Sequence, residues 1–518
     1  MTPATGRKLS LHQAWVISAV SGFLALAWEI VWMRLYNFTT SSRAIAFGLM
    51  LGAYLLGLAI GSLWSRRWHR LDAQGQQPMA ALASLIQRAN VAAFMVVPVA
   101  SWLAMWIWWP WTLLAVMLAA AVLGTILPML CHIAIPPDGD AGQRMAGIYL
   151  ANIIGSGLGS LLTGFFFMEY LTLQWLCLLL FCIAQGLAMY VSWGSGRPVA
   201  VTAPIAGIVL LGAFLGYAGL WERLQYLDKY QWGMQFVKTI ESRHGVITVD
   251  SEGTIYGNSA YDGSLDVRLR DGSWLVRPYF IGALHPHPRR VLVIGVSGGA
   301  WTQILANYPT VEELVGVEIS EPYFRLIRDS PTVSSLMTNP KVKLVVDDGR
   351  RWLKRNPTER FDLIVMNTTH HWREFASALL SREFLELAKG HLNEGGLVAW
   401  NCTESARAAK TGLTVFPHSV MLMNFFVGSP SPIVPDKARW RSVLEKWSID
   451  GRPVFDLQTA EGREQLEKCV AFADNEGPWD SKVHFWRWMN RARMEERFGN
   501  AEIITDENLG HEFSWGNW

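Results

Sequence analysis

Long apolar runs fill the first part of the chain and constrain its fold more than any other feature. Stretches of mostly apolar residues recur up to Trp221, each near the roughly 20 residues that an α-helix needs to cross a bilayer core. From Glu222 onward the sequence has the mixed composition of an ordinary globular protein. The chain therefore divides near this position into an apolar helical part and a soluble part.

The apolar part predicts about seven transmembrane helices. A buried bundle in a soluble protein is the alternative, but these segments are too long and too uniformly apolar for it. Only 17% of the chain is charged, against roughly a quarter in a typical soluble protein. The predicted spans lie near residues 12–34, 44–64, 80–103, 111–135, 144–168, 172–193 and 200–220.

Two features of the predicted spans point to more than simple membrane crossing. Glu29 lies inside the first span, with Arg34 just beyond it, and an ionisable residue at membrane depth is a functional candidate. A structural pair between neighbouring helices is the interpretation that we favour, because one carboxylate makes a poor transport pathway. Gly155 and Gly159 form a GxxxG pair, which predicts close packing of two helices.

Charge and cysteine content exclude several classes of function. The formal net charge of +2 gives no reason to expect a nucleic-acid partner. None of the five cysteines forms a CxxC pair, so neither a disulfide framework nor a zinc site is expected. The partners that we expect are the lipid bilayer and a small molecule, and a homo-oligomer stays open.

The soluble part begins with a region rich in strand and turn signals. Val246–Val249 is a short β-branched run, and Tyr261-Asp262-Gly263 and Asp271-Gly272 have the composition of hairpin turns. We therefore expect a small β subdomain from about Glu241 to Arg277.

Five strands alternate with helices after this region, and the first of them is expected to be buried. They are predicted at Val291–Ile294, Leu314–Val317, Val342–Val346, Phe361–Met366 and Gly396–Trp400. Alternation of this kind predicts a parallel, doubly wound sheet, which binds ligands at the carboxyl ends of its strands.

Each of the first three strands ends in groups that suit a nucleoside. Glycines let the backbone approach a ligand closely, and Glu318 follows the glycine loop by about 20 residues, the usual spacing for a carboxylate that binds ribose hydroxyls. The loop lacks GxGxxG spacing, so a dinucleotide fold is not indicated. The residues predicted to form the nucleoside pocket are Gly295, Ser297, Gly299, Glu318, Asp347, Asp348 and Gly349.

These residues resemble the spermidine synthase family. The matching stretch runs from about Glu241 to Asn401, and its strongest parts are Val291–Gly295, Val317–Ile319, Asp348-Gly349 and Phe361–Ile364. More specifically, the chain resembles the bacterial membrane-fused members of that family. Segments similar to theirs are Ala27–Arg34, Gly124–Pro128 and Thr505–Asn508.

The resemblance implies both a fold and a reaction. The fold is an N-terminal transmembrane α-helical bundle, followed by a C-terminal α/β Rossmann-like domain of the methyltransferase and spermidine synthase type with a small β subdomain. The implied substrate is S-adenosylmethionine or its decarboxylated form, with no permanently bound cofactor and no metal. In classical members a polyamine nitrogen attacks the carbon next to the sulfonium and methylthioadenosine leaves, while a carboxylate accepts the amine's proton.

The chain departs from the family pattern where that family binds the amine. An aspartate of the family's glycine loop corresponds to Gly298, and the Asp-Ser-x-Asp that ends the fourth strand is replaced by the sequence Asn367-Thr368-Thr369-His370. The acidic gate before the main domain is matched best by Tyr261-Asp262. The nucleoside pocket is therefore expected to be kept, while the polyamine pocket has lost negative charge.

These departures define the remaining candidate site residues. His370 or His371 is expected to replace the missing base, since histidine titrates near neutral pH, and Asn367 lies beside them. A surface loop without a catalytic role is the alternative for both histidines. Tyr261 and Asp262 are candidates for binding the substrate. Arg373 is expected either to pair with Glu374 or to bind a substrate carboxylate.

Three functions fit this pattern. The first is a membrane-bound aminopropyltransferase-like enzyme of polyamine metabolism. The second is an enzyme that cleaves S-adenosylmethionine within one molecule to methylthioadenosine and a lactone, which needs no polyamine pocket. The third is a transporter or sensor whose soluble domain binds a nucleoside. Few charges lie in the predicted spans, which counts against an ion-coupled transporter.

The side of the membrane is the point on which the signals conflict. Under the positive-inside rule, seven spans and the basic loops place the soluble domain outside, whereas an adenosyl-sulfonium substrate is made in the cytosol. We favour a bacterial inner-membrane protein with a cytoplasmic catalytic domain and a span count that is off by one. The basic residues concerned are Arg7, Lys8, Arg66, Arg67, Arg70, Arg144 and Arg197.

Four domains follow from these patterns. We expect a transmembrane domain at 1–220, a linker and β subdomain at 221–285, a nucleoside-binding catalytic domain at 286–404, and a C-terminal extension at 405–518 that packs on the catalytic domain.

Overall fold

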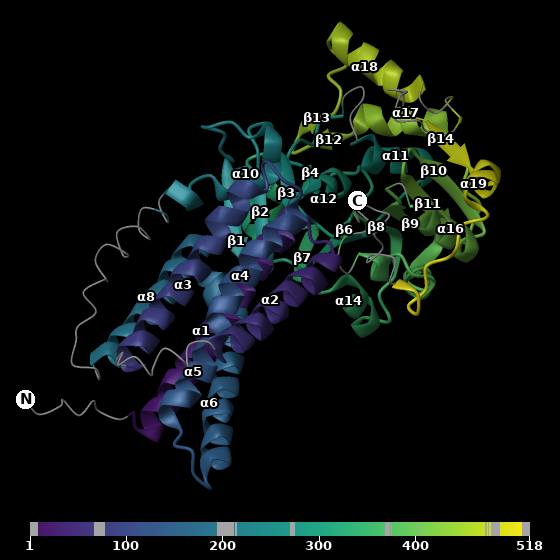
Figure 1. Cartoon of the computed structure of the whole chain (residues 1–518). Helices are drawn as coiled ribbons and strands as arrows, with labels where there is room; N and C mark the ends of the chain where they lie inside the picture. The colour runs from purple at the N-terminus through teal and green to yellow at the C-terminus, as the bar shows by residue number, and fades with distance from the viewer. Residues whose placement is uncertain are drawn as a thin grey trace, which may run out of the picture. The chain divides into compact units, whose positions relative to one another are not determined.

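The computed structural model divides into two compact units, Met1–Thr248 and Val249–Trp518 (Figure 1). The division falls inside strand β2 (Gly245–Val249), later than the change in composition near Trp221. Each unit is considered by itself below. The residues that the structure describes are 9–66, 78–193, 212, 215–269, 275–367, 373, 376–403, 405–471, 474, 476–477 and 487–509.

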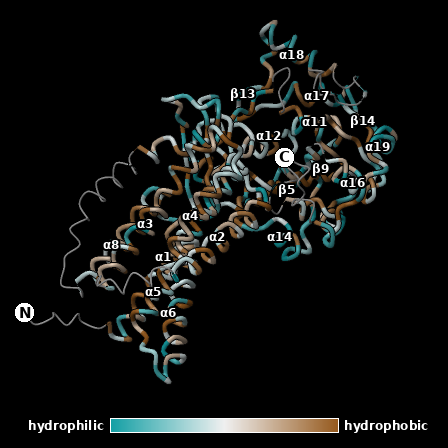
Figure 2. The backbone as a smooth tube through the Cα atoms, in the orientation of Figure 1, coloured by the Kyte–Doolittle hydropathy of each residue, from teal (hydrophilic) through white to brown (hydrophobic). Residues whose placement is uncertain are grey.

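The first unit is built from long apolar helices. Among its described residues, six helices are long and apolar enough to cross a membrane. Figure 2 shows that hydrophobic residues predominate along them. The helices and short helical segments are α1 (Leu11–Thr39), α2 (Ile45–Trp64), α3 (Pro78–Leu103), η3 (Trp109–Thr112), α4 (Leu113–Gly124), α5 (Ile126–Ala134), α6 (Ala141–Leu161), η4 (Leu162–Phe167), α7 (Met168–Tyr170) and α8 (Leu173–Trp193).

The prediction of an N-terminal bundle of long apolar helices is confirmed. The six candidate spans match the first six predicted segments. The fourth runs from Trp109 to Ala134 and combines η3, α4 and α5, and the fifth runs from Ala141 to Tyr170. The predicted seventh span at 200–220 lies mostly outside the described residues. Helix α10 (Leu220–Tyr226) begins at the end of that segment.

Helices α1 and α6 cross closely because glycines line their contact. A Cβ atom at Gly155 would lie 1.8 Å from the Ala19 carbonyl oxygen, and one at Gly159 would lie 2.2 Å from that of Phe23. The Ser18 hydroxyl also donates a hydrogen bond to the Ile148 carbonyl, at 2.8 Å. The close packing predicted from the GxxxG pair is confirmed.

Arg34 is buried at the end of α1 and interacts with groups other than Glu29. It donates to the Gly245 carbonyl at 3.3 Å, and it interacts electrostatically with Glu241 and Glu169. The half-buried Glu29 forms no ion pair with any described residue, and Tyr54 is its electrostatic neighbour. The structural pair favoured for Glu29 from the sequence is therefore not formed within the described part of the unit.

The second unit contains an eight-stranded sheet in the order β14-β10-β11-β9-β8-β5-β6-β7. The five strands β5 to β9 are parallel, as predicted, while β10, β11 and β14 add an antiparallel edge. Strand β11 lies between β9 and β10. The strands are β5 (Arg290–Ile294), β6 (Glu313–Glu318), β7 (Val342–Val346), β8 (Phe361–Met366), β9 (Leu392–Asn401), β10 (His418–Leu422), β11 (Phe425–Ser429) and β14 (Trp488–Asn490).

Alternating side chains of the central strands pack into two separate apolar cores. Val291 and Val293 of β5 join one cluster, and Leu292 and Ile294 join the other. This alternation places the two clusters on opposite faces of the sheet. Helices that contribute to the first cluster are α11 (Val276–Leu284), α12 (Ala300–Ala306), α13 (Pro322–Arg328), α17 (Lys437–Lys446) and α18 (Ala460–Ala471). Those that contribute to the second are α14 (Gly349–Arg355), α15 (Arg382–Lys389), α16 (Ala406–Val415) and α19 (Arg491–Phe498).

A β-hairpin made of β3 (Thr254–Gly257) and β4 (Ala260–Ser264) opens the second unit. Its turn is Asn258-Ser259, and both residues have positive φ, at 46° and 69°. Such angles fit a two-residue turn whose twist matches the strands. The turn expected at Tyr261-Asp262-Gly263 is therefore wrong, because these residues lie in β4. The turn expected at Asp271-Gly272 lies outside the described residues.

The α1–α6 contact makes a direct prediction. Gly155→Ala should destabilise the first unit by about 1–3 kcal/mol, because the added methyl group meets backbone. Gly157→Ala in the same helix is the matched control, since a Cβ there would have no atom within 4 Å. Thermal unfolding of the detergent-solubilised protein checks this, and equal midpoints for the two variants would contradict the packing described.

Candidate functional site

The carboxyl ends of the parallel strands carry the residues from which a site can be built. The loop between β5 and α12 has positive φ at Gly295 (80°), Ser297 (49°) and Gly299 (87°). Glycine adopts this conformation freely, whereas serine needs support from its surroundings. Ser297 has that support, because its amide donates to Glu318 Oε2 at 3.0 Å and its hydroxyl donates to the Asp262 carbonyl oxygen at 2.7 Å.

Glu318 ends strand β6 and connects two loops. Its Oε2 accepts the Ser297 amide, and its Oε1 accepts the Ser320 amide at 2.9 Å. The side chain is 5% exposed, and this burial raises the pKa of its carboxyl group despite the two backbone hydrogen bonds. Each oxygen has a second lone pair, so the carboxylate can still accept hydrogen bonds from a ligand.

Asp347 and Asp348 follow strand β7 and have different partners. Asp348 caps helix α14, because its Oδ1 accepts the Arg351 amide at 2.7 Å. Its Oδ2 accepts no hydrogen bond from a described residue. Asp347 is held by the guanidinium group of Arg351, with Arg355 at 3.8 Å. Of the two carboxylates, Asp348 is therefore the one with an oxygen left for a ligand.

The β3–β4 hairpin is fixed to the glycine loop by a buried cluster around Asp262. The Asp262 carboxylate accepts from Arg373 Nη1 at 3.0 Å and from the Tyr323 hydroxyl. Arg373 Nη2 also donates to the Gly257 carbonyl at 3.1 Å. Burial and the neighbouring Asp262 raise the pKa of Tyr323 well above its usual value. The cluster places the charge of Arg373 against Asp262, while Tyr261 on the other side of β4 is 39% exposed.

Asn367 follows strand β8 and belongs to a chain of side-chain hydrogen bonds. Asn401 Nδ2 donates to Asn367 Oδ1 at 3.3 Å, and Arg277 Nη1 donates to Asn401 Oδ1 at 2.7 Å. His370 and His371, predicted as catalytic, lie outside the described residues, as does Glu374.

A side chain at Gly298 would require the side chain of Ile255 to move. A Cβ atom there would lie 1.9 Å from Ile255 Cδ1, with Leu265 Cδ2 at 3.5 Å. An apolar side chain of the hairpin thus fills the space beside the glycine loop where position 298 would point.

Comparisons with known proteins place this arrangement in a family. Residues 280–410 match the model of the spermine/spermidine synthase domain. The polyamine aminopropyltransferase of Pyrococcus abyssi is 33% identical over 194 residues, which cover 36% of this chain and 67% of that protein. The chain belongs to the polyamine aminopropyltransferase family.

Other relatives align with this chain over shorter stretches of sequence. The polyamine aminopropyltransferase of Thermococcus onnurineus is 36% identical over 124 residues, covering 24% of this chain and 43% of that protein. The spermidine synthase of Dictyostelium discoideum is 31% identical over 135 residues, covering 26% and 47%. The chain thus spans less than half the length of these two relatives. A solved structure of the spermidine synthase from Thermotoga maritima aligns with a TM-score of 0.35 and 16% identity, covering 46% of this chain and 84% of that one.

Sequence reasoning missed three residues that organise the site in this member of the family. Tyr323 binds Asp262, and Arg277 and Asn401 lead to Asn367. Arg277 had a detectable signal, because it is a single charge in the otherwise apolar stretch Val276–Leu284. Tyr323 and Asn401 had none, since their roles depend on contacts with segments distant in sequence.

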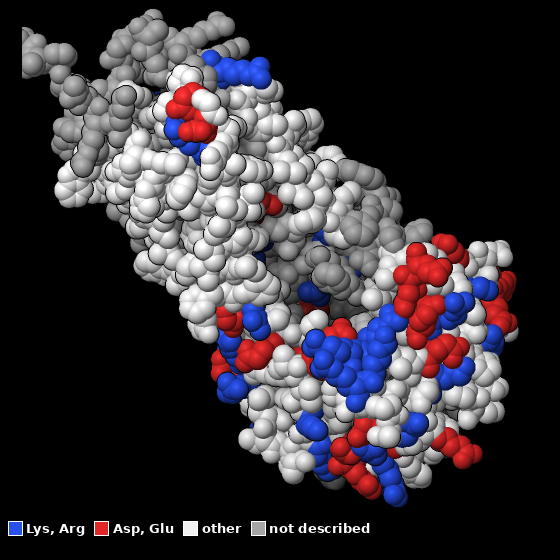
Figure 3. Space-filling model, turned by 90° about the horizontal axis from the view of Figure 1, so that it is seen from below, with Lys and Arg blue, Asp and Glu red and all other residues white. Residues whose placement is uncertain are grey.

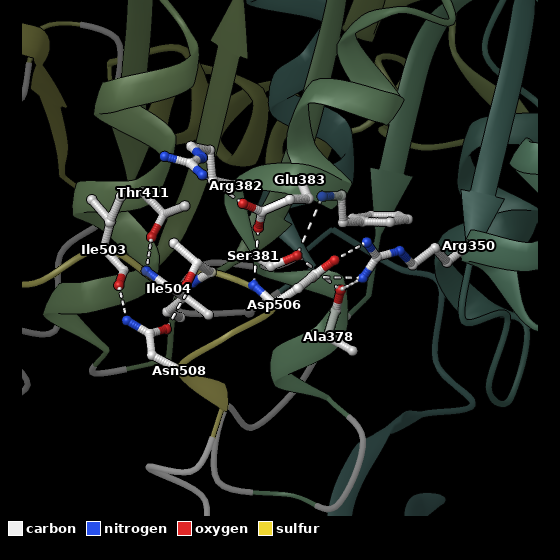
Figure 4. Close-up of polar contacts among 12 residues, drawn as sticks. Arg350, Ala378, Ser381, Arg382, Glu383, Thr411, Ile503, Ile504, Asp506 and Asn508 are labelled. Atoms are coloured by element: carbon white, nitrogen blue, oxygen red, sulfur yellow. Dashed lines mark hydrogen bonds and ion pairs between the residues drawn. The ribbon is translucent and has the colours of Figure 1, made fainter.

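The segment Thr505–Asn508, which resembles a segment of the membrane-fused members, contacts helices α14 and α15 (Figure 4). The Asp506 carboxylate pairs with the guanidinium group of Arg350, which directly follows Asp348-Gly349 at the start of α14. The Asp506 amide donates to Glu383 Oε2 at 3.0 Å. Asn508 closes the segment on itself, accepting from the Thr505 amide at 2.7 Å. This segment therefore connects α14 with the start of α15.

The Arg350–Asp506 pair predicts a pH dependence. Hydrogen bonding to Arg350 lowers the pKa of Asp506, so the pair stabilises the folded segment above the ordinary carboxyl pKa of about 3.9 and is lost as pH falls through the lowered value. Because Asp506 is 38% exposed, we expect a contribution of only about 0.2–1 kcal/mol. Hydrogen exchange of residues 503–509 should rise at neutral pH in Asp506→Asn. The exposed neighbour variant Glu507→Gln should leave it unchanged, and equal exchange in both variants would contradict the role of the pair.

Proposed function

We propose that this protein is a membrane-embedded, spermidine-synthase-like enzyme of polyamine metabolism. It would bind S-adenosylmethionine or its decarboxylated form and release methylthioadenosine, with its catalytic domain on the cytoplasmic side of a bacterial inner membrane. The relatives named above are polyamine aminopropyltransferases and a spermidine synthase, which is why this class of reaction is proposed.

Exposed apolar surface supports the membrane embedding. Bulky side chains on α6 point outward, including Leu150 at 58%, Ile154 at 54% and Leu161 at 57% exposure. In the view of Figure 3, charged residues are frequent over the second unit and sparse over the long helices. A soluble protein rarely exposes an apolar surface of this extent.

The proposal of a nucleoside pocket rests chiefly on one observation, which is the buried Glu318 carboxylate beside the glycine loop. A carboxylate at this strand end suits the two ribose hydroxyls, and the open Oδ2 of Asp348 suits an amino group on the base. The reaction demands little more than positioning, because the sulfonium leaving group is already activated. A nucleophile attacks the adjacent carbon, the C–S bond breaks, and its electron pair stays on sulfur in methylthioadenosine.

Proton removal from an amine nucleophile would fall to the segment after β8. Asn367 lies at its start, and His370 and His371 follow as the candidate bases. Neutral imidazole accepts a proton near pH 7.

A second reaction is favoured by the space at Gly298. The resemblance expects an aspartate that binds an amino group there, but Ile255 fills the space. Cleavage of S-adenosylmethionine within one molecule needs no amine acceptor. In that reaction a carboxylate oxygen of the substrate attacks its own γ-carbon, the C–S bond breaks, and methylthioadenosine and a lactone result.

Methylthioadenosine release separates these reactions. Purified full-length protein is given each sulfonium compound, with and without putrescine. Release that depends on the amine identifies an aminopropyltransferase, and release from S-adenosylmethionine alone identifies the lactone-forming reaction. Binding without release in any mixture would contradict both and indicate a sensor or transporter.

Glu318 offers a test of the pocket itself. Glu318→Gln should weaken methylthioadenosine binding by about one to two orders of magnitude, because a charge-assisted hydrogen bond to ribose contributes about 1.5–3 kcal/mol. Glu312→Gln removes a carboxylate that is 66% exposed just before β6 and should leave binding unchanged. Isothermal titration calorimetry measures both, and unchanged affinity in Glu318→Gln would remove this residue from the pocket.

A further inference from the structure

Arg277 is a buried cation close to the carboxyl ends of β8 and β9. It lies on helix α11 with 7% exposure, and its guanidinium group stacks 4.9 Å from the centre of the Trp301 ring. Its Nη1 donates to Asn401 Oδ1 at 2.7 Å and to Asn424 Oδ1 at 3.1 Å. Burial lowers the pKa of Arg277 to about 10, so the group stays protonated at neutral pH.

The chemistry of arginine fixes the orientation of the next amide. A guanidinium group can only donate hydrogen bonds, so Asn401 must turn its oxygen toward Arg277. The Asn401 nitrogen then faces Asn367, where it donates to Oδ1 at 3.3 Å. The oxygen of Asn367 is therefore occupied, and its Nδ2 has no acceptor among the residues that the structure describes. Arg277 donates to Asn401 and Asn401 donates to Asn367, so both hydrogen bonds of this chain have the same direction.

Asn367 lies beside the start of the glycine loop, where the proposed function places the reacting part of the substrate. Its backbone amide donates to the Ile294 carbonyl at 3.0 Å, which places it against the start of the glycine loop. A Cβ atom at Gly295 would lie 3.5 Å from the Asn367 carbonyl oxygen. The residue is half-buried, so part of its surface remains exposed.

We propose that the Arg277–Asn401–Asn367 chain presents an N–H donor that selects a sulfonium substrate bearing a carboxylate, namely S-adenosylmethionine itself rather than its decarboxylated form. The proposal rests on the proposed nucleoside-binding function and names its substrate. An N–H donor backed by a cation attracts a carboxylate and repels an ammonium group. Asn367 therefore offers a hydrogen-bond donor, whereas a carboxylate that binds an amine offers an acceptor.

Asn401→Asp tests the direction of the chain without changing the residue nearest the substrate. A carboxylate can only accept, so it would accept from Arg277 and from Asn367 Nδ2. Asn367 would then turn its oxygen toward the substrate. Asn424→Asp is the matched control, because it adds the same charge beside Arg277 outside the chain that reaches Asn367.

Binding of three compounds to the full-length protein in detergent is measured by calorimetry. Methylthioadenosine lacks the amino-acid portion and reports on the nucleoside pocket alone. The wild type should bind S-adenosylmethionine about tenfold more tightly than its decarboxylated form, which corresponds to one charge-assisted hydrogen bond. Asn401→Asp should abolish or reverse this ratio while methylthioadenosine affinity holds, and Asn424→Asp should retain the ratio.

The outcomes distinguish this proposal from the proposed function. If methylthioadenosine binds but the wild type shows no preference for S-adenosylmethionine, the selectivity is refuted while the nucleoside pocket stands. An unchanged ratio in Asn401→Asp refutes the orientation argument. If none of the three compounds binds to the wild type, the proposed function and this inference both fall. Should Asn401→Asp lose methylthioadenosine binding through misfolding, Asn367→Asp replaces the donor directly and must reverse the preference.

Discussion

The contact between the Glu318 carboxylate and two backbone amides is the interaction on which the rest of the site depends. It holds Ser297 in a left-handed conformation that this residue does not adopt without support. The same serine then binds the hairpin through the Asp262 carbonyl. Loops from β5, β6 and the β3–β4 hairpin are thus fixed by one buried acid. The cost of burying its charge is offset only in part by the two amide hydrogen bonds, because burial still raises the pKa of the carboxyl group.

Much of this architecture follows from local sequence, and the part that does not has a common cause. The strands β5 to β8 were predictable because short runs such as Val291–Ile294 are apolar and β-branched. The glycine loop and Glu318 were predictable from their spacing. The turn at Asn258-Ser259 was missed because its serine replaces the glycine that marks such turns. The antiparallel strands β10 and β14, and the contacts of Tyr323 and Asn401, depend on tertiary pairing that no local pattern encodes.

The first unit shows how polar groups are accommodated among long apolar helices. Glu241 accepts from the Trp221 indole at 3.1 Å and from the Leu173 amide at 2.7 Å, and it is an electrostatic neighbour of Arg34. The half-buried acid thus lies in the electrostatic field of the buried cation at the end of α1. Burial raises the pKa of Glu241, which marks the energetic cost of keeping it inside. Close glycine contacts between α1 and α6 supply the dispersion energy that holds the helices together.

The segment that contains Asp506 has a consequence for the order of folding. It contacts α14 and α15 across 156 and 123 residues of sequence, and strand β14 completes one edge of the sheet. Contacts between segments so distant in sequence require a long loop to close before they form. The second unit therefore gains these contacts late in its folding, after the shorter-range pairing of its parallel strands.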